Sequence, residues 1–338
     1  MCARADGRLG GTLILKERYE QDLRLVSSLQ GWVAFLAVAA VFAALPLFAS
    51  KFVAYEVSRF MTYALVAIGL NFLVGFTGQV SLGHAGFFAL GSYALGALTT
   101  LAGVPFLLAL PAAGLLTALV GFLLGIPALR LSGPYLAIAT LGFGLAVEKI
   151  AATIPALGGF NGLEVSRPVV LGLSFADDRA YYVVVLVFTA LMVFAAFNLA
   201  RSHVGRAFVA VRDAELAAQT SGVNLAAYKT LAFALSAFFT GVAGGLYAPL
   251  VGRIDPASFN IFLSILFLAM VLIGGIGTVA GAILGAGLIV VLQFFLSSQG
   301  TWSQVIYGAV LVLVMLFEPL GLYGRWLKIK IYWKGWPF

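Results

Sequence analysis

The sequence predicts an all-α protein that crosses a membrane eight to ten times. Hydrophobic residues make up 62% of its 338 residues and charged residues only 10%, and the mean hydropathy is +1.06. A soluble domain cannot hide so large an apolar fraction in its interior. The apolar residues also form long segments without the alternation of barrel strands, so the membrane-spanning elements are expected to be helices.

Ten apolar segments are candidates for these helices. They are residues 31–49, 60–76, 80–102, 104–129, 134–156, 180–200, 228–248, 261–273, 279–296 and 302–317. Several contain glycine, and short ones such as 261–273 are alternatively re-entrant half-helices, which would lower the number of full spans to eight or nine. The transmembrane domain is therefore expected at residues 31–318, between an N-terminal segment 1–30 and a C-terminal tail 319–338.

The polar ends of these segments predict the orientation. Residues 1–30 mix both charges and lack the short basic lead of a signal peptide, so the first apolar segment is expected to be retained. With the N-terminus inside, most of the twenty Lys and Arg residues fall on the inner side, where such residues concentrate in membrane proteins. Both termini and the loop 201–228 are therefore predicted to be cytoplasmic. The same distribution explains the net charge of +7 without nucleic acid.

The longest polar interruption of the transmembrane domain, residues 201–228, has the pattern of a helix. Four of its residues recur at helical spacing, namely Val204, Phe208, Val211 and Glu215. Gly222 is well placed to stop this helix in the left-handed conformation.

Two sets of side chains on this helix suit contact with another protein. Small side chains let a partner's surface approach the backbone, and here they are Ala214, Ala217 and Ala218. Exposed charges pair across interfaces, and the candidates are Arg212, Asp213 and Glu215. The alternative is an amphipathic helix that lies on the membrane surface without a partner.

Two glycine-rich stretches interrupt the apolar segments. The prominent glycines are Gly75, Gly78 and Gly83 in the first stretch, and Gly274 and Gly277 in the second. Glycine lets membrane helices approach closely, and a helix that breaks at depth must line a cavity or be buried in protein. The stretches therefore indicate either an internal two-fold repeat with broken helices or glycines that only help helices to pack.

Polar side chains at or near membrane depth are candidates for a solute path. An unpaired polar group is costly there, so each one bonds to another helix or faces water. For His84 the alternatives are a hydrogen bond that ties its loop to a neighbouring span and contact with a solute. Pro134 fits the first turn of a helix, with Ser132 as its cap. The path candidates are Asn71, Gln79, Ser81, His84, Tyr93, Tyr135 and Thr140, and packing is the alternative for the last three.

Several motifs of enzymes and ion-coupled carriers are missing from the sequence. It contains no G-x-x-x-x-G-K-[ST] motif for ATP, and its two histidines lie in separate segments without a metal motif. Its single cysteine, Cys2, cannot form an intrachain disulfide. Of the thirteen carboxylates, only Glu148 is expected within the hydrocarbon, which gives little support to ion coupling. A membrane-embedded enzyme is the weakest hypothesis, and we expect no catalytic residue, metal or cofactor in this chain.

Three motifs resemble the permease subunits of bacterial branched-chain amino-acid ABC importers. They are YALVAIGLNFLVGFTGQVSLGHAGFFALGSY at 63–93, SGPYLAIATLGFG at 132–144 and GRAFVAVRDAELAAQTSGVN at 205–224. With the glycines at 274–281, the resemblance extends over residues 60–318, and it is closer to the M-type permease than to the H-type. Two departures are Leu145, where the family often has an acidic residue, and the loop 157–163, which lacks a usual threonine.

The resemblance implies an ABC importer permease in a bacterial inner membrane, with the 201–228 loop as its coupling helix. The implied partners are a homologous H-type permease, two cytoplasmic ATPases that bind ATP and Mg, a periplasmic binding protein and membrane lipid. Glu215, Ala217, Ala218 and Gly222 match the family's coupling motif. The full set of expected coupling residues is Arg206, Arg212, Asp213, Glu215, Ala217, Ala218 and Gly222.

The resemblance also implies the solute class, branched-chain or related amino acids moved into the cytoplasm. Close relatives are thought to carry urea, short amides or aromatic acids, which the sequence leaves open. The alternative of another class is an ion-coupled or facilitative carrier that acts alone, for which a docking helix would have no use.

Overall fold

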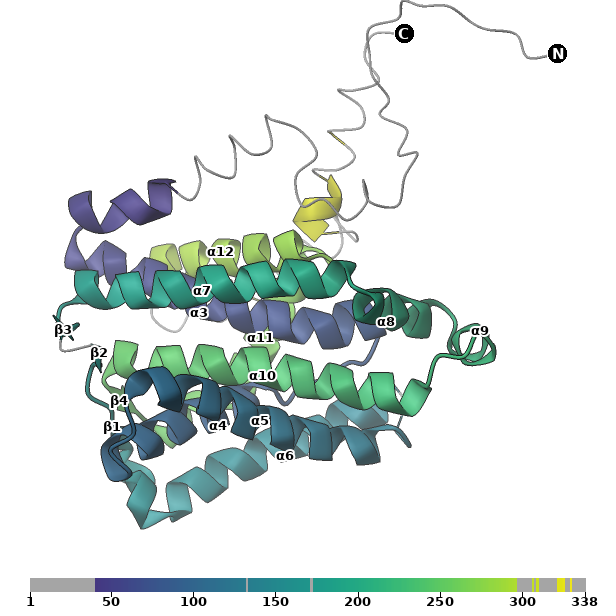
Figure 1. Cartoon of the computed structure of the whole chain (residues 1–338), viewed down its shortest axis with the longest axis horizontal. Helices are drawn as coiled ribbons and strands as arrows, with labels where there is room; N and C mark the ends of the chain where they lie inside the picture. Colours follow the sequence, from purple (N-terminus) through teal and green to yellow (C-terminus); the bar gives the residue numbers. More distant parts are fainter. Residues whose placement is uncertain are drawn as a thin grey trace, which may run out of the picture.

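The computed structural model describes residues 40–131, 133–170 and 173–296, together with 306, 308, 309, 321–325 and 329. Figure 1 shows the long helices of this part lying side by side along the longest axis of the molecule. Helix is by far the dominant structure in these residues, as the sequence predicts. Strands β1 to β4 are only two residues each.

Six helices in the described residues are long and apolar enough to cross a membrane. They are α3 with its extension η1 (Lys51–Phe76), α5 (Phe106–Ala128), α6 (Pro134–Thr153), α7 (Asp178–Arg201), α10 (Leu225–Val251) and α12 (Val279–Leu296). The expected segment 302–317 lies largely outside the described residues, and of 31–49 the structure describes a helix at 40–48. The expected count of eight to ten is therefore not confirmed.

Two further apolar helices do not count among these six. Helix α11 (Ile261–Gly274) has 14 residues, and α4 (His84–Gly96) has 13 before it continues as the π-helix η2 (Ala97–Leu101). At 1.5 Å per residue, α11 is about 21 Å long, shorter than the hydrocarbon core of about 30 Å. The expected span 80–102 is helical from His84 to Leu101, and residues 80–83 precede the helix. The start of α6 at Pro134 agrees with the sequence, while Ser132 lies outside the described residues.

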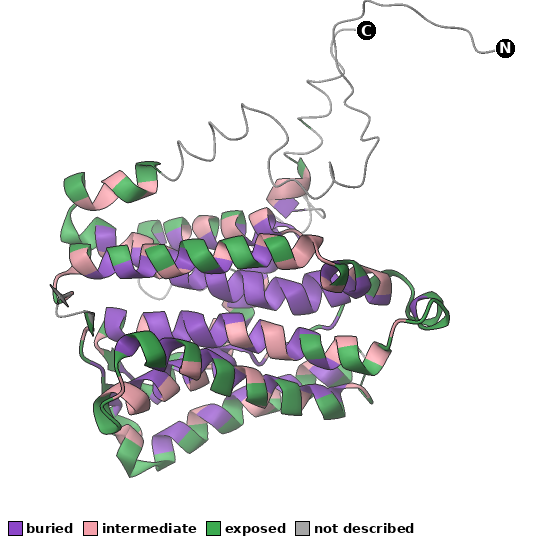
Figure 2. Ribbon diagram, viewed as in Figure 1, coloured by how far each residue is buried: buried purple, intermediate pink, exposed green. Residues whose placement is uncertain are grey.

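The core of the bundle is formed by α3, α4 and α10, which pack against one another. Figure 2 shows α3 and α10 mostly buried, whereas α5, α6 and α7 carry exposed residues along their outer sides. Over an apolar stretch of 18 residues in each helix, 83% of the residues are buried in α3 with η1, against 28% in α7. Leu119, Ile138 and Leu191 are among the exposed apolar residues. These outer faces therefore suit membrane lipid or another membrane protein.

Glycines allow α4 and α10 to touch at their backbones. A Cβ atom added to Gly91 of α4 would lie 2.1 Å from the carbonyl oxygen of Gly241 in α10. Any side chain at position 91 would push the helices apart. The buried position of α4 in the centre of the bundle therefore depends on this contact.

One end of the bundle, here called the strand end, carries short strands and ion pairs. Strand β1 (Leu163–Glu164) pairs antiparallel with β4 (Arg253–Ile254), and β2 (Val169–Val170) pairs antiparallel with β3 (Leu173–Ser174). The 3-10 helices η3 (Pro155–Leu157), η4 (Gly159–Asn161) and η5 (Pro256–Phe259) complete the connections.

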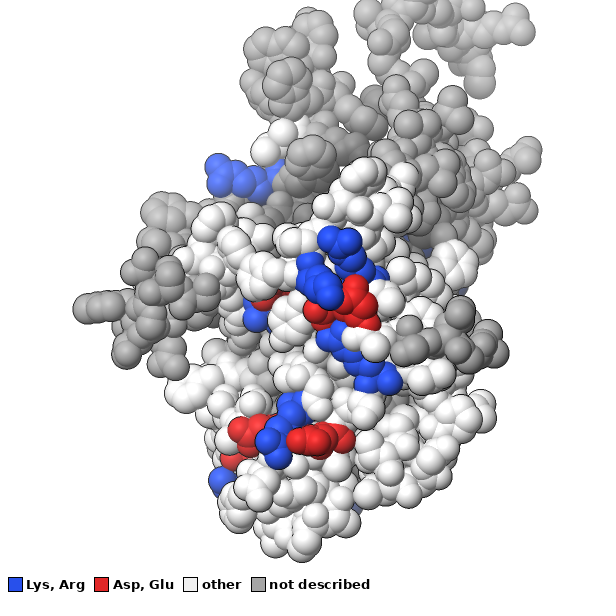
Figure 3. All heavy atoms as spheres, turned by 90° about the vertical axis from the view of Figure 1, so that its left-hand side faces the viewer, with Lys and Arg blue, Asp and Glu red and all other residues white. Residues whose placement is uncertain are grey.

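Figure 3 views this strand end, where basic and acidic side chains gather in mixed groups. The ion pairs Lys51–Asp177, Arg167–Asp178 and Glu164–Arg253 lie here. The opposite end, here called the loop end, carries α8 (His203–Asp213) and α9 (Glu215–Thr220).

Candidate functional site at the loop end and the glycine turns

The polar loop forms two helices rather than one. Ser202 caps α8, because its hydroxyl accepts hydrogen bonds from the backbone N–H groups of Val204 and Gly205. The helix ends at Asp213, since Ala214 is extended with φ −158° and ψ 94°, and α9 begins at Glu215. The expectation of a single helix through these positions is therefore wrong.

Packing on the bundle explains the break. Phe208 and Val211 of α8 are buried, with Phe208 edge-on to Tyr228 of α10, and Ala218 of α9 is buried as well. After the break at Ala214, α9 stays near the start of α10, where Glu215 bonds to Lys229, while Leu216 and Ala217 are exposed. Gly222 has φ +86°, as expected for a glycine that ends this helix.

Helix α9 is the most prominent feature of the loop end, where it projects beyond the long helices (Figure 1). Leu216 is 79% exposed, and Ala217 is exposed beside it. Leu216 gave no signal in the sequence, because single apolar residues are common on protein surfaces. The α9 surface, Glu215 to Gln219, therefore has the composition of a small docking site.

The charged candidates of the loop have different neighbours. Glu215 is partly exposed and accepts a hydrogen bond of 2.6 Å from Lys229 Nζ of α10. Arg206 donates to the carbonyl oxygen of Arg201 at the start of the loop. Asp213 is exposed and pairs with the Nε of its neighbour Arg212 at 2.9 Å. Glu215 and Asp213 thus remain accessible on the outer surface.

Arg212 is 34% exposed, but its guanidinium reaches the bundle, unlike the other charged candidates. Its Nη1 donates a hydrogen bond of 2.8 Å to the carbonyl oxygen of Gly75, at the end of α3. Its Cγ lies 3.2 Å from where a Cβ atom on Gly78 would be, and its Nη1 lies 3.0 Å from the corresponding position on Gly277. Arg212 therefore occupies a slot between the two glycine-rich stretches.

The two glycine-rich stretches contact each other directly. Asn71 donates from Nδ2 to the carbonyl oxygen of Thr278 at 2.7 Å and accepts from the N–H of Gly277 at 2.9 Å. A Cβ atom on Gly75 would lie 2.4 Å from the backbone nitrogen of Gly277. The π-helix η1 (Phe72–Phe76) and the turn between Gly274 and Val279, here called the two glycine turns, therefore pack backbone to backbone.

A second polar cluster surrounds the start of α4. The chain between Gly78 and His84 is not helical, so the first N–H groups of α4 and the turn before it need partners. Thr140 of α6 accepts from Leu82 N–H, and Ser264 of α11 accepts from Ala85 N–H, each at 3.0 Å. Gly83 packs closely as well, because its Cβ would lie 2.4 Å from the carbonyl oxygen of Thr140. Residues from other helices therefore cap α4.

His84 is fully buried in this cluster. Its Nε2 lies 2.7 Å from Ser236 Oγ in the middle of α10, and its Nδ1 lies 3.2 Å from Ser81 Oγ. This geometry agrees with the interpretation of His84 as a tie between its loop and a neighbouring span. Ser236 and Ser264 carried no signal in the sequence, because single serines are common in membrane helices.

The other path candidates lie apart from one another. Gln79 is buried and donates to Thr77 Oγ1 at 3.0 Å. Tyr93 donates from its hydroxyl to the carbonyl oxygen of Ile254 at the strand end, at 3.4 Å, and Tyr135 is 71% exposed at the start of α6. The seven candidates thus fall in several places, and their role in a solute path stays a prediction.

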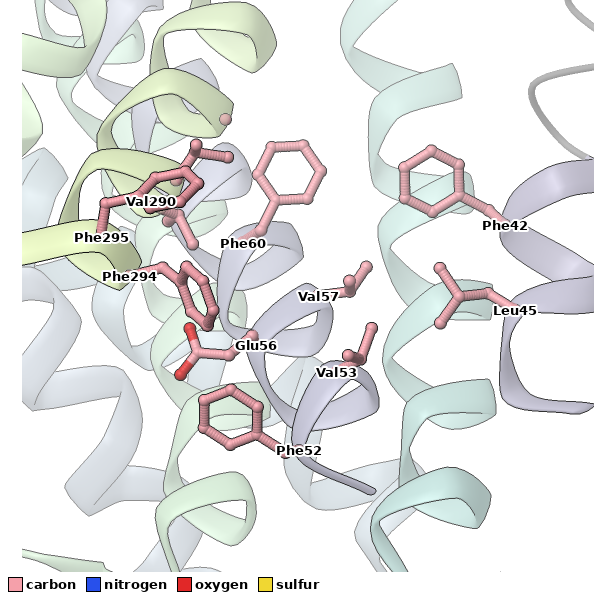
Figure 4. Close-up of a pocket in the computed structure, with 12 residues that line it drawn as sticks. Phe42, Leu45, Phe52, Val53, Glu56, Val57, Phe60, Val290, Phe294 and Phe295 are labelled. Carbon is pink, nitrogen blue, oxygen red and sulfur yellow. The ribbon is translucent and has the colours of Figure 1, made fainter. Parts of the chain in front are cut away.

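A pocket of about 560 Å³ lies between α3, α12 and the helix at 40–48 (Figure 4). Glu56 is the one charged residue among those that line it. Its Oε2 forms an ion pair with Arg59 Nη2 at 2.6 Å. The rest of the lining is apolar and includes Phe52, Phe60 and Phe294. This lining suits hydrocarbon rather than a charged solute. In the described residues, no three His, Cys, Asp or Glu side chains lie together as metal ligands.

Comparisons with known proteins match most of this chain. A family model described as the permease component of branched-chain amino acid transport systems matches residues 52–315. The high-affinity branched-chain amino acid transport system permease protein LivM of Salmonella typhimurium is 37% identical over 287 residues, covering 78% of this chain and 68% of that protein.

Two further relatives are more distant in sequence. BraD of Pseudomonas aeruginosa is 29% identical over 288 residues, covering 78% of this chain and 92% of that protein. LivH of Escherichia coli K12 is 29% identical over 290 residues, covering 78% of this chain and 92% of that protein. No solved structure gave a significant match. Because the matched residues 52–315 include both glycine turns, the buried cluster and the α8–α9 loop, the chain belongs to the family of branched-chain amino acid transport permeases.

Proposed function

We propose that this chain is the M-type permease subunit of an ATP-driven importer that moves branched-chain or related amino acids across a bacterial inner membrane into the cytoplasm. The match of the family model to residues 52–315 carries this proposal. The higher identity to LivM than to LivH supports the M-type subunit and suggests a homologous H-type permease as its partner in the membrane.

The loop end is the cytoplasmic side in this proposal, as the distribution of Lys and Arg indicates. Two ATPase subunits bind and hydrolyse ATP with Mg, and one of them docks on the α9 surface. Leu216 fills an apolar depression of the ATPase, while Glu215 and Asp213 pair with basic groups at its rim. Both termini of the chain lie on this side.

The strand end then faces the periplasm, where a binding protein delivers the solute. Mixed charges such as Lys51, Arg167 and Arg253 give this surface groups for transient, charge-guided contacts (Figure 3). Exposed apolar faces of α5, α6 and α7 contact lipid and the second permease.

Transport in this scheme requires movement of helices and no covalent step in this chain. When the ATPases close on ATP, they shift α9, and the spans change from inward-facing to outward-facing. The polar groups at Asn71, Gln79, Ser81, His84, Tyr93, Tyr135 and Thr140 are the candidates for contacts along the path.

Reconstitution tests the proposal directly. The chain is placed in proteoliposomes with its partner permease and two ATPases, the binding protein and radiolabelled leucine are added, and uptake is measured with and without ATP. Uptake that requires ATP and all subunits supports the proposal. Uphill uptake by the chain alone on an ion gradient would refute it in favour of a self-sufficient carrier.

The solute is determined in a separate experiment. Calorimetric titration of the binding protein with leucine, urea and benzoate identifies which class it captures, because that protein is expected to set most of the selectivity. Submicromolar binding of leucine alone supports amino-acid transport. Binding of urea or benzoate instead would assign the importer to one of the related solutes.

A further inference from the structure

We propose that Arg212 is a positioning residue that transmits movement of α8 to both glycine turns at once. This inference rests on the proposed function, because it concerns how ATPase movement reaches the spans. It separates Arg212 from the other charged residues of the loop, which were all expected to face the ATPase.

The first contact is with the end of α3. The N–H groups that follow η1 bond to earlier carbonyls, Gly78 to Val74 and Gln79 to Leu73. The carbonyl oxygen of Gly75 accepts its hydrogen bond from the guanidinium of Arg212 instead. A hydrogen bond from a charged donor is stronger than one between neutral groups, so this contact holds the end of α3 firmly to α8.

The second contact is with the turn between α11 and α12. The Arg212 Nη1 lies 3.0 Å from the position that a Cβ atom on Gly277 would occupy, and any side chain there would displace it. Gly277 is itself bonded to Asn71 of α3. The guanidinium therefore touches both turns where they are already joined.

The side chain of Arg212 is oriented by its neighbour Asp213, and its backbone by the packing of α8 on the bundle. Asp213 binds its Nε at 2.9 Å, and the neighbouring Val211 is buried against the bundle. Lysine cannot reproduce this arrangement, because its single ammonium cannot bond to Asp213 and span the two turns in the fixed geometry of a guanidinium.

These contacts form a mechanical route from the docking surface to the spans. A force on Leu216 of α9 acts on α8, and α8 acts through Arg212 on the points where α3 ends and α12 begins. Helices α3 and α12 also pack against each other along their length. Movement of α8 therefore shifts both helices as a pair.

The test compares R212Q, R212K and the control R130Q in the full complex of both permeases, ATPases and binding protein. Arg130 is an exposed arginine after α5, and R130Q removes the same charge without touching a glycine turn. Three quantities are measured: co-purification of the ATPases, ATP hydrolysis, and leucine taken up per ATP hydrolysed.

In R212Q, co-purification and hydrolysis stay near the wild-type values, while uptake per ATP falls by about tenfold, as expected from losing a charged hydrogen bond. R212K restores part of this ratio, and R130Q matches the wild type. An unchanged ratio in R212Q overturns the inference, and so does loss of ATPase binding in both R212Q and R212K, which would make Arg212 a docking or folding residue. If the wild-type complex shows no ATP-driven uptake, the proposed function itself fails and takes this inference with it.

Discussion

Asn71 and Gly277 lie 206 positions apart in the sequence, yet the Asn71 side chain is bonded to the backbone on both sides of the Gly277–Thr278 peptide. One amide group thus satisfies a donor and an acceptor of the second glycine turn. Since Asn71 is buried, these two bonds are shielded from water, and they join α3 to the start of α12.

The variant N71D tests this junction. An aspartate cannot donate to the Thr278 carbonyl oxygen, so two oxygens would face each other in a buried site. We expect a loss of about 1–3 kcal/mol in the free energy of unfolding, seen as a lower melting temperature in detergent. The same exchange at exposed Asn161, N161D, is the control and should leave the melting temperature unchanged. Equal melting of both variants would contradict the bonding described here.

Ser264 tests the capping of α4 by another helix. Removing its hydroxyl in S264A leaves the buried N–H of Ala85 without this acceptor, which should cost about 1–3 kcal/mol of stability. The control is S258A in η5, which removes the same hydroxyl from an exposed serine and should leave the stability unchanged. A melting curve for S264A that overlays that of S258A would show that α4 does not depend on this cap.

Gly91 tests the close contact of α4 with α10. G91A places a Cβ atom against the carbonyl of Gly241, so it should destabilise the protein by about 1–3 kcal/mol or prevent its accumulation in the membrane. The control is G142A in α6, where no atom lies within 4 Å of the added Cβ. Alanine there should be neutral or stabilising by up to about 1 kcal/mol, because glycine is a poor helix former. The reverse order of stabilities would refute this helix packing.

Leu216 tests the α9 surface. L216S should reduce co-purification of the ATPases by about tenfold, the effect of losing an apolar anchor at an interface. Its melting temperature should stay unchanged, because the side chain is mostly exposed. L101S removes an exposed leucine at the strand end and should change neither quantity. Full ATPase binding by L216S would place the docking surface elsewhere.

The ion pair of Lys51 with Asp177 predicts a pH dependence at the strand end. The Lys51 ammonium donates a hydrogen bond to Asp177 and holds the pKa of that carboxyl below its ordinary value of 3.8. Because the folded pKa is the lower one, the stabilisation is present above the unfolded pKa and is lost as the pH falls through the folded pKa. The melting temperatures of wild type and K51Q should differ slightly at pH 7 and converge as the pH falls below the ordinary carboxyl pKa of 3.8. A difference that stays constant with pH would exclude this pair as its cause.

Local sequence was sufficient for the long spans and for some of their ends. Segments such as 104–129 and 228–248 correspond closely to α5 and α10, because the transfer of a long apolar segment into lipid depends only on its own composition. Pro134 and Gly222 mark helix boundaries through their own backbone geometry. The motifs were enough to identify the family.

The break at Ala214, the cap on α4 and the direction of Arg212 were decided by the tertiary structure. The last two depend on partners far away in the chain: Gly75 lies 137 positions from Arg212, and Ser264 lies 179 from Ala85. The loop pattern predicted an exposed charge at Arg212, which its side chain partly is, but helical spacing says nothing of the Gly75 carbonyl that its guanidinium meets. A buried backbone oxygen needs a hydrogen-bond donor, and the Gly75 carbonyl oxygen finds one in the Arg212 guanidinium. The position of this oxygen depends on the packing of the two glycine turns.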